Sequence, residues 1–200
     1  MRVLSIIHYP VFGGPHNRNS IVIPLLERVG VETTMLLPDE QGNAAERLRN
    51  AGVDVIQLPI DRLRLSRNPM VYARFFANLW PNVRQIRRLI RERRIDVVQV
   101  NGLVNPHGAI AGHLENVAVV WQLLDTVPMA ARRVVMPLVK RIADVVMSTG
   151  LKVAQVHPGA VEFGDRLIFF FHRLTFRSFN LIQQSEPRPE WNSDCQIAIS

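Results

Sequence analysis

The amino-acid sequence predicts an α/β protein built as a Rossmann-like, doubly wound parallel sheet. Short β-rich apolar runs alternate with amphipathic helical segments about six times along the 200 residues, an order typical of a parallel sheet with helices on both faces. The run 117–123 is almost entirely apolar, as expected for a strand that is buried on both faces. A hydrophobic content of 48% is ordinary for a globular core and excludes wholesale disorder.

The first half of the chain contains three predicted strands and two helices. Residues 3–7 form the first strand, and a turn-rich stretch follows it. We expect the next helix to begin after Asn17 and to end at Gly30. The rest of this half is a strand over 33–37, a helix over 44–51 that ends at Gly52, and a strand over 53–58.

The second half starts with one long helical stretch over 68–94, which we expect Pro81 to interrupt. Its later part carries apolar side chains on one stripe at helical spacing, and its arginines lie mostly elsewhere. The elements that follow are strands over 95–100, 117–123, 144–147 and 167–171, separated by helices over 106–114, 128–142 and 152–157.

Cysteine content and the N-terminal apolar run restrict the protein class and the compartment. The single cysteine, Cys195, excludes a disulfide framework and a zinc site with several cysteines, and it fits a reducing compartment. The apolar run over 3–7 is too short for a signal peptide or a membrane span. These features predict a cytoplasmic protein.

The net charge of +7 comes from arginine, since only two of the 24 basic residues are lysines. An arginine excess can reflect a GC-rich genome. Six of the arginines, however, lie between 84 and 94, and such a cluster can meet the phosphates of nucleic acid, anionic lipid or a nucleotide. No nucleic-acid recognition motif accompanies the cluster, so no nucleic-acid partner is expected.

Ligands of doubly wound sheets bind at the carboxyl ends of the strands. We therefore expect candidate site residues in the loops that follow the strands. The loop after the first strand holds Gly13, Gly14 and His16. Paired glycines allow close approach of a ligand to the backbone, and the following helix N-terminus favours an anion. A plain tight turn is the alternative. The loop is neither a G-x-G-x-x-G fingerprint nor a P-loop, which disfavours dinucleotide redox chemistry and P-loop phosphoryl transfer.

Two further loops carry polar side chains at strand ends. Asn101 and His107 follow the strand over 95–100 and suit hydrogen bonds to sugar hydroxyls, whereas Asn105 is expected to cap the next helix. Asp125 follows the strand over 117–123 and suits a general base or a hydrogen-bond acceptor, with an N-cap role as the alternative. The histidines lack metal-ligand spacing, so no metal site is expected.

Several of these segments together resemble family-4 glycosyltransferases of the GT-B fold. The resemblance rests on the Gly-Gly loop, on the segments Ile95–Gly102 and Val120–Thr126 at strand ends, and on Ala143–Thr149. It covers about residues 1–170 and corresponds to the N-terminal, acceptor-side domain of that family, which is one half of a GT-B architecture.

The resemblance implies transfer of a sugar, with retention, from a nucleotide-sugar donor in glycan or cell-envelope biosynthesis. The acceptor would be a glycan, a lipid-linked molecule or a small molecule, and no cofactor would be tightly bound. Gly13 and Gly14 would approach the donor pyrophosphate, with His16 beside them, and Asn101 and His107 would line the acceptor side. The family often has a His-Asp pair where this chain has Leu124–Asp125, so the catalytic histidine is missing and Asp125 is the catalytic candidate.

The resemblance also predicts that residues 1–170 form one domain and that the C-terminal donor-binding domain is absent. The tail over 171–200 departs from the family. Its codons near His172 can spell the family's Pro-Val-Asp continuation after a one-nucleotide shift, which suggests a frameshift; the alternative is a genuine divergent tail. A chain truncated in this way is expected to be inactive alone. A non-catalytic Rossmann-like module that needs a partner chain is the second hypothesis.

Aromatic residues precede the arginine cluster and suggest a peripheral contact with the inner face of a membrane through 72–94. The alternative is that the aromatic side chains pack in the core and that the arginines form a solvated helix face.

Overall fold

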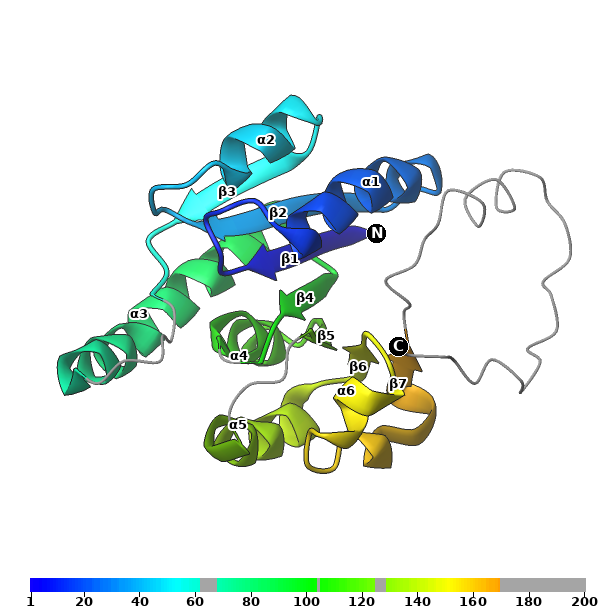
Figure 1. Cartoon of the computed structure of the whole chain (residues 1–200). Coiled ribbons are helices and arrows are strands. Elements are labelled where there is room, and N and C mark those ends of the chain that lie inside the picture. The colour runs from blue at the N-terminus through cyan, green and yellow to red at the C-terminus, as the bar shows by residue number, and fades with distance from the viewer. Residues whose placement is uncertain (62–67, 104, 125–128, 170–200) are drawn as a thin grey trace, which may run out of the picture. The chain divides into compact units, whose positions relative to one another are not determined.

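The computed structural model describes residues 1–61, 68–103, 105–124 and 129–169, except for the side chain of Ala130. In these residues seven strands form one parallel sheet in the order β3-β2-β1-β4-β5-β6-β7. The chain runs outward from β1 to β3, crosses back to β4 and runs outward again to β7 (Figure 1). The predicted doubly wound sheet is therefore confirmed.

The strands are β1 Arg2–Ile7, β2 Glu32–Pro38, β3 Asp54–Leu58, β4 Val97–Asn101, β5 Ala118–Leu123, β6 Val145–Ser148 and β7 Leu167–Phe169. The helices are α1 Gly14–Arg28, α2 Ala44–Asn50, α3 Pro69–Arg93, α4 His107–Leu114, α5 Met129–Ile142 and α6 Leu151–Gln155, with a 3₁₀ helix, η1, over Val161–Arg166. By its contacts Met1–Phe170 is one compact unit. The tail from 171 on, and with it the frameshift hypothesis, lies outside the described residues.

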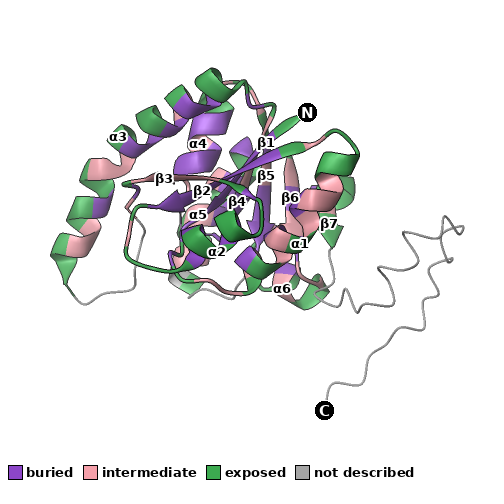
Figure 2. Ribbon diagram, turned by 90° about the horizontal axis from the view of Figure 1, so that it is seen from above, coloured by how far each residue is buried: buried purple, intermediate pink, exposed green. Residues whose placement is uncertain are grey.

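Each face of the sheet has its own apolar core, because successive side chains of a strand point to opposite faces. Leu4 and Ile6 of β1 belong to the core that also contains the buried side of α3 and residues of α4 and α5. Ile7 belongs to the second core, with Ile23 of α1 and residues of α2. Figure 2 shows the buried residues concentrated in the strands, while exposed residues follow the outward side of α3.

The starts of α1 and α4 differ from the prediction. α1 begins at Gly14, earlier than expected, with Pro15 in its first turn, where a missing N–H costs nothing. α4 begins at His107 and Pro106 is its N-cap. The expectation that Asn105 caps this helix is therefore wrong.

The predicted interruption at Pro81 is also wrong, since α3 runs through it as one helix of 25 residues. A proline inside a helix removes the hydrogen bond to the carbonyl four residues earlier. Here that residue is Ala77, and both Ala77 and Pro81 are exposed. Water can therefore reach the freed carbonyl, and the buried apolar stripe on the opposite side holds the helix together.

Candidate functional site

The carboxyl edge of the sheet brings the predicted site loops together. β1 and β4 are neighbours, with Ile7 beside Asn101, and β4 and β5 are neighbours, with Asn101 beside Gln122. The parallel strands end at the same edge, so the segments that follow them are close in space although the first is about 100 residues from the other two in the sequence.

The loop after β1 presents the N-terminus of α1. Gly13 has an extended backbone, a Cβ there would meet no atom within 4 Å, and Gly14 is exposed. His16 is buried, and its Nδ1 accepts a hydrogen bond from the Gly13 N–H at 3.1 Å while its Nε2 lies 3.0 Å from the Tyr9 carbonyl oxygen. Nε2 therefore carries the proton, and burial lowers the pKa of His16. Both ring nitrogens of His16 are thus engaged with the loop backbone. A ligand at this loop would therefore meet backbone groups and the open space beside Gly13.

Asn101 lies in a polar network between β1, β4, β5 and α1. Its Nδ2 donates to Ser5 Oγ at 3.1 Å and to the Ile6 carbonyl at 3.0 Å. Its Oδ1 accepts from the Arg18 guanidinium at 3.1 Å, and the same Arg18 nitrogen donates to Gln122 Oε1 at 2.8 Å. The whole amide of Asn101 is thus used inside the chain.

Arg18 also lies at this edge, although the sequence pattern did not single it out. It lies in the second turn of α1, and two neutral amide oxygens from β4 and β5 hold its guanidinium at the carboxyl edge. Burial lowers the pKa of Arg18, yet an arginine is a cation at neutral pH. A basic residue one turn after a glycine-rich loop is the signal that could have indicated it.

His107, the first residue of α4, is 2% exposed and packs edge-on against Phe75 of α3, with ring centroids 5.1 Å apart. Burial lowers the pKa of His107 to about 4, although the charge of Asp61 acts in the opposite direction. Among the described residues His107 Nε2 has no hydrogen-bond partner. Asp61 is held by Asn78 at 2.5 Å and Arg74 at 3.2 Å. His107 is therefore a neutral ring at neutral pH, and its Nε2 is buried without a hydrogen-bond partner among the described residues.

Gly102 ends β4 in a conformation that requires glycine. Its φ is +96°, and a Cβ there would lie 2.7 Å from Cε1 of His8, which is itself buried. The backbone after β4 thus depends on the close approach of Gly102 to the His8 ring at this edge.

A Gly102→Ala variant is expected to lose about 1 to 3 kcal/mol of its free energy of unfolding, because alanine is strained at positive φ and displaces His8. Urea unfolding measures the loss. Gly13→Ala is the matched control, since the extended backbone and the open space at Gly13 accept a methyl group. Equal stability of the two variants would contradict the close approach.

Asp125 lies outside the described residues, as does the N-cap role weighed for it. Leu124, the residue before it, is half-buried. The catalytic role of Asp125 stays a prediction. Within the part of the chain that the structure describes, no three histidine, cysteine or acidic side chains come close enough to hold a metal ion.

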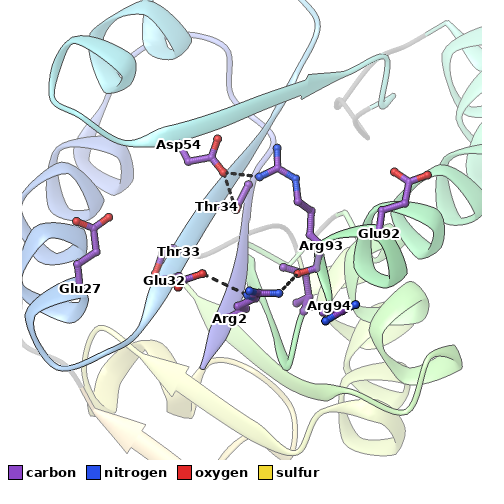
Figure 3. Close-up of a pocket in the computed structure, with 10 residues that line it drawn as sticks. Arg2, Glu27, Glu32, Thr33, Thr34, Asp54, Glu92, Arg93 and Arg94 are labelled. Carbon is purple, nitrogen blue, oxygen red and sulfur yellow. Dashed lines mark hydrogen bonds and ion pairs between the residues drawn. The ribbon is translucent and has the colours of Figure 1, made fainter.

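A cavity of about 650 Å³ opens at the opposite edge of the sheet, near the amino ends of β1, β2 and β3. Figure 3 shows Arg2 pointing toward Glu32 and Arg93 toward Asp54. Arg2 pairs with Glu32 at 3.2 Å and Arg93 pairs with Asp54 at 3.0 Å. These exposed pairs satisfy one another and add little stability, and ligands of doubly wound sheets bind at the other edge. We therefore place the candidate site at the carboxyl edge.

No protein-family model matches the chain, and no curated protein matches its sequence. Solved structures do match its fold. HepE (Alr3699) from Anabaena in complex with UDP aligns with a TM-score of 0.63 and 17% identity over 92% of this chain and 50% of that chain. A glycosyltransferase from Rickettsia africae aligns with a TM-score of 0.59 and 16% identity over 94% of this chain and 50% of that chain.

An enzyme with another printed activity matches at a similar TM-score. UDP-GlcNAc 2-epimerase from Neisseria meningitidis bound to UDP-GlcNAc aligns with a TM-score of 0.58 and 11% identity over 84% of this chain and 45% of that chain. The chain thus spans about half the length of the solved structures it matches. At these identities the likeness shows the fold alone. The chain has the fold of one half of these GT-B-like glycosyltransferase and epimerase structures.

Proposed function

We propose that this chain is the acceptor-side half of a family-4-like glycosyltransferase that transfers a sugar from a nucleotide-sugar donor with retention. The carboxyl edge carries the proposal, because it places the N-terminus of α1, the Arg18 guanidinium and the neutral ring of His107 around neighbouring strand ends. The sequence resemblance supports this activity, and the fold agrees with it, although the matched structures include an epimerase as well as a glycosyltransferase.

The donor diphosphate would meet the N-terminus of α1. The first-turn N–H groups of a helix have no partner inside the helix, and its dipole favours negative charge there. Glycine at positions 13 and 14 keeps side chains away from that approach, and Arg18 adds a positive charge one turn further on. The phosphates could therefore be held by the chain's own groups, without a resident metal ion.

The acceptor would lie beside His107, whose buried Nε2 can exchange one hydrogen bond with a hydroxyl group. In the reaction the bond from the sugar C1 to the acceptor oxygen forms, and the bond from C1 to the donor phosphate oxygen breaks. The acceptor loses its proton and the nucleoside diphosphate leaves. Asp125 is the proposed catalytic residue, as a hydrogen-bond acceptor or base near the reacting hydroxyl. We place this activity in the cytoplasm, and glycan or cell-envelope molecules are the proposed acceptors.

A second candidate is a non-catalytic binding module. One observation favours it: the polar side-chain atoms of Asn101 and His16 are already hydrogen-bonded within the chain. Such a module would bind the nucleotide or the acceptor but would turn nothing over without a partner chain.

A Gly13→Val variant is expected to weaken binding of nucleotide-sugars at least about ten-fold, because its side chain fills the space where the diphosphate would meet α1. Calorimetry with a panel of nucleotide-sugars measures the affinity, and an assay for released nucleoside diphosphate measures turnover. The fold should persist, since valine readily adopts the extended conformation found at Gly13.

Turnover by the full chain that is lost in Gly13→Val and in Asp125→Asn would support the transferase and contradict the non-catalytic module. Binding that is weakened by Gly13→Val, without turnover, would support the placement of the diphosphate at α1 and is expected both of the module and of a transferase half that is inactive alone. Binding that is unaffected by the substitution, or the absence of any nucleotide-sugar binding, would contradict that placement.

A further inference from the structure

The outward side of α3 carries apolar and basic side chains that nothing in the described chain covers. Its members recur every three or four residues and are all exposed, and we call them the outer face of α3: Met70, Ala73, Phe76, Ala77, Trp80, Arg84, Arg88 and Arg91. Met70, Phe76 and Trp80 are 68%, 65% and 45% exposed, although all three are large and apolar. The apolar residues occupy the N-terminal half of the helix and the arginines occupy the C-terminal half.

The arginines of this face carry an excess of positive charge. Arg87 and Arg91 share one acidic partner, Glu115, at 2.6 and 3.2 Å. Arg84 and Arg88 have no acidic partner among the described residues, and the Arg84 guanidinium lies 5.8 Å from the centre of the Trp80 ring. These four arginines, together with Glu92, line a hollow of about 420 Å³, which is wide enough for an anionic headgroup.

We infer that the outer face of α3 docks on an anionic phospholipid surface. A helix that lies in the membrane interface buries its apolar side chains at the boundary between headgroups and acyl chains and directs its basic side chains to lipid phosphates. Trp80, flanked by Phe76 and Arg84, has this arrangement. None of the described helices is long and apolar enough to cross a membrane, so the contact is with one surface.

A nucleic acid would use only part of this face. Its phosphates could pair with Arg84 and Arg88, but Met70 and Phe76 would remain in water. The lipid surface accounts for both halves of the helix and is therefore the favoured partner.

The docked face adjoins the candidate site. Phe76 packs edge-on against Phe75, with ring centroids 5.4 Å apart, and Phe75 packs in turn against His107. Docking would thus hold the carboxyl edge of the sheet near the lipid headgroups. The inference stands on the exposure and charge of α3 and holds whether or not the proposed transferase activity is found.

Co-sedimentation of the full chain with vesicles tests the inference. We expect the chain to bind vesicles that contain phosphatidylglycerol, to bind pure phosphatidylcholine poorly, and to be released by salt. Arg84→Gln with Arg88→Gln should weaken binding about 25-fold, since each arginine near an anionic surface contributes about five-fold. Phe76→Ser with Trp80→Ser should weaken it about ten-fold or more through lost apolar burial. Brominated lipid should quench tryptophan fluorescence in the native chain and much less in Trp80→Phe.

A matched pair on α5 serves as the control, because Arg133 and Val134 are also exposed on a helix. Arg133→Gln with Val134→Ser should bind as the native chain does. The inference is overturned if the chain does not bind anionic vesicles, if the two α3 variants bind them unchanged, or if duplex DNA of generic sequence binds through Arg84 and Arg88 while vesicles do not. Circular dichroism of each variant verifies that these exposed substitutions leave the fold intact.

Discussion

Replacement of Trp121 by alanine is expected to lower the free energy of unfolding by about 3 to 5 kcal/mol. Trp121 lies in the middle of the sheet on β5, is 0% exposed and belongs to the core beneath α4 and α5. Its indole N–H donates to the Gly102 carbonyl at 3.0 Å. The substitution therefore leaves a large cavity and a buried carbonyl without its donor. Urea unfolding followed by circular dichroism measures the loss.

Two comparisons make this prediction specific. Trp80→Ala on α3 removes a side chain of the same kind that is 45% exposed, so it should cost about 1 kcal/mol or less. Trp121→Phe keeps much of the apolar volume but loses the N–H group, and it should cost about 1 to 2 kcal/mol. A Trp121→Ala variant as stable as Trp80→Ala would show that β5 is not at the centre of the core.

Acidification from pH 6.5 to pH 4 is expected to remove about 3 kcal/mol of stability through His107 alone. Burial lowers the pKa of His107 from 6.5 to about 4. Between these two pH values the His107 ring is therefore protonated in the unfolded chain and neutral in the folded chain. Stability is thus present in full above pH 6.5, falls as the pH drops and levels off below about pH 4. The difference in pKa, at 1.36 kcal/mol per unit, sets the size of the effect.

The measurement compares the native chain with His107→Gln across this range, because other groups also titrate there. The stability difference between the two proteins should change by about 3 kcal/mol in favour of the variant on acidification. Glutamine keeps a polar side chain next to Phe75 but takes up no proton. An NMR titration of His107 with a midpoint near pH 6.5 would contradict its burial against Phe75.

The sequence predicted the strands well because their pattern is local. The first strand was expected over 3–7 and is observed over Arg2–Ile7, and the strand expected over 117–123 is observed over Ala118–Leu123. The predicted break at Pro81 was wrong. Proline locally disfavours a helix, but the burial of the apolar stripe of α3 outweighs that effect. For the same reason the sequence could not divide the aromatic residues of α3 into Phe75, which is buried, and Phe76, which is exposed.

The candidate site shows the same division between local and distant effects. The sequence predicted that these loops share one edge of the sheet, because topology places the ends of parallel strands there. The sequence does not reveal that the Asn101 amide is hydrogen-bonded to Ser5, Ile6 and Arg18. These partners lie on β1 and α1, more than 80 residues away. Arg18 was missed because only the folded chain brings it to β4 and β5.

By itself, the sequence determined the fold class and the order of helices and strands. Periodicity and turn residues act over a few neighbouring positions, and so these features can be read from the chain. Only the tertiary structure decided which polar side chains at the carboxyl edge are hydrogen-bonded to one another. Burial, hydrogen-bond partners and the lowered pKa of His107 depend on segments that folding alone brings into contact.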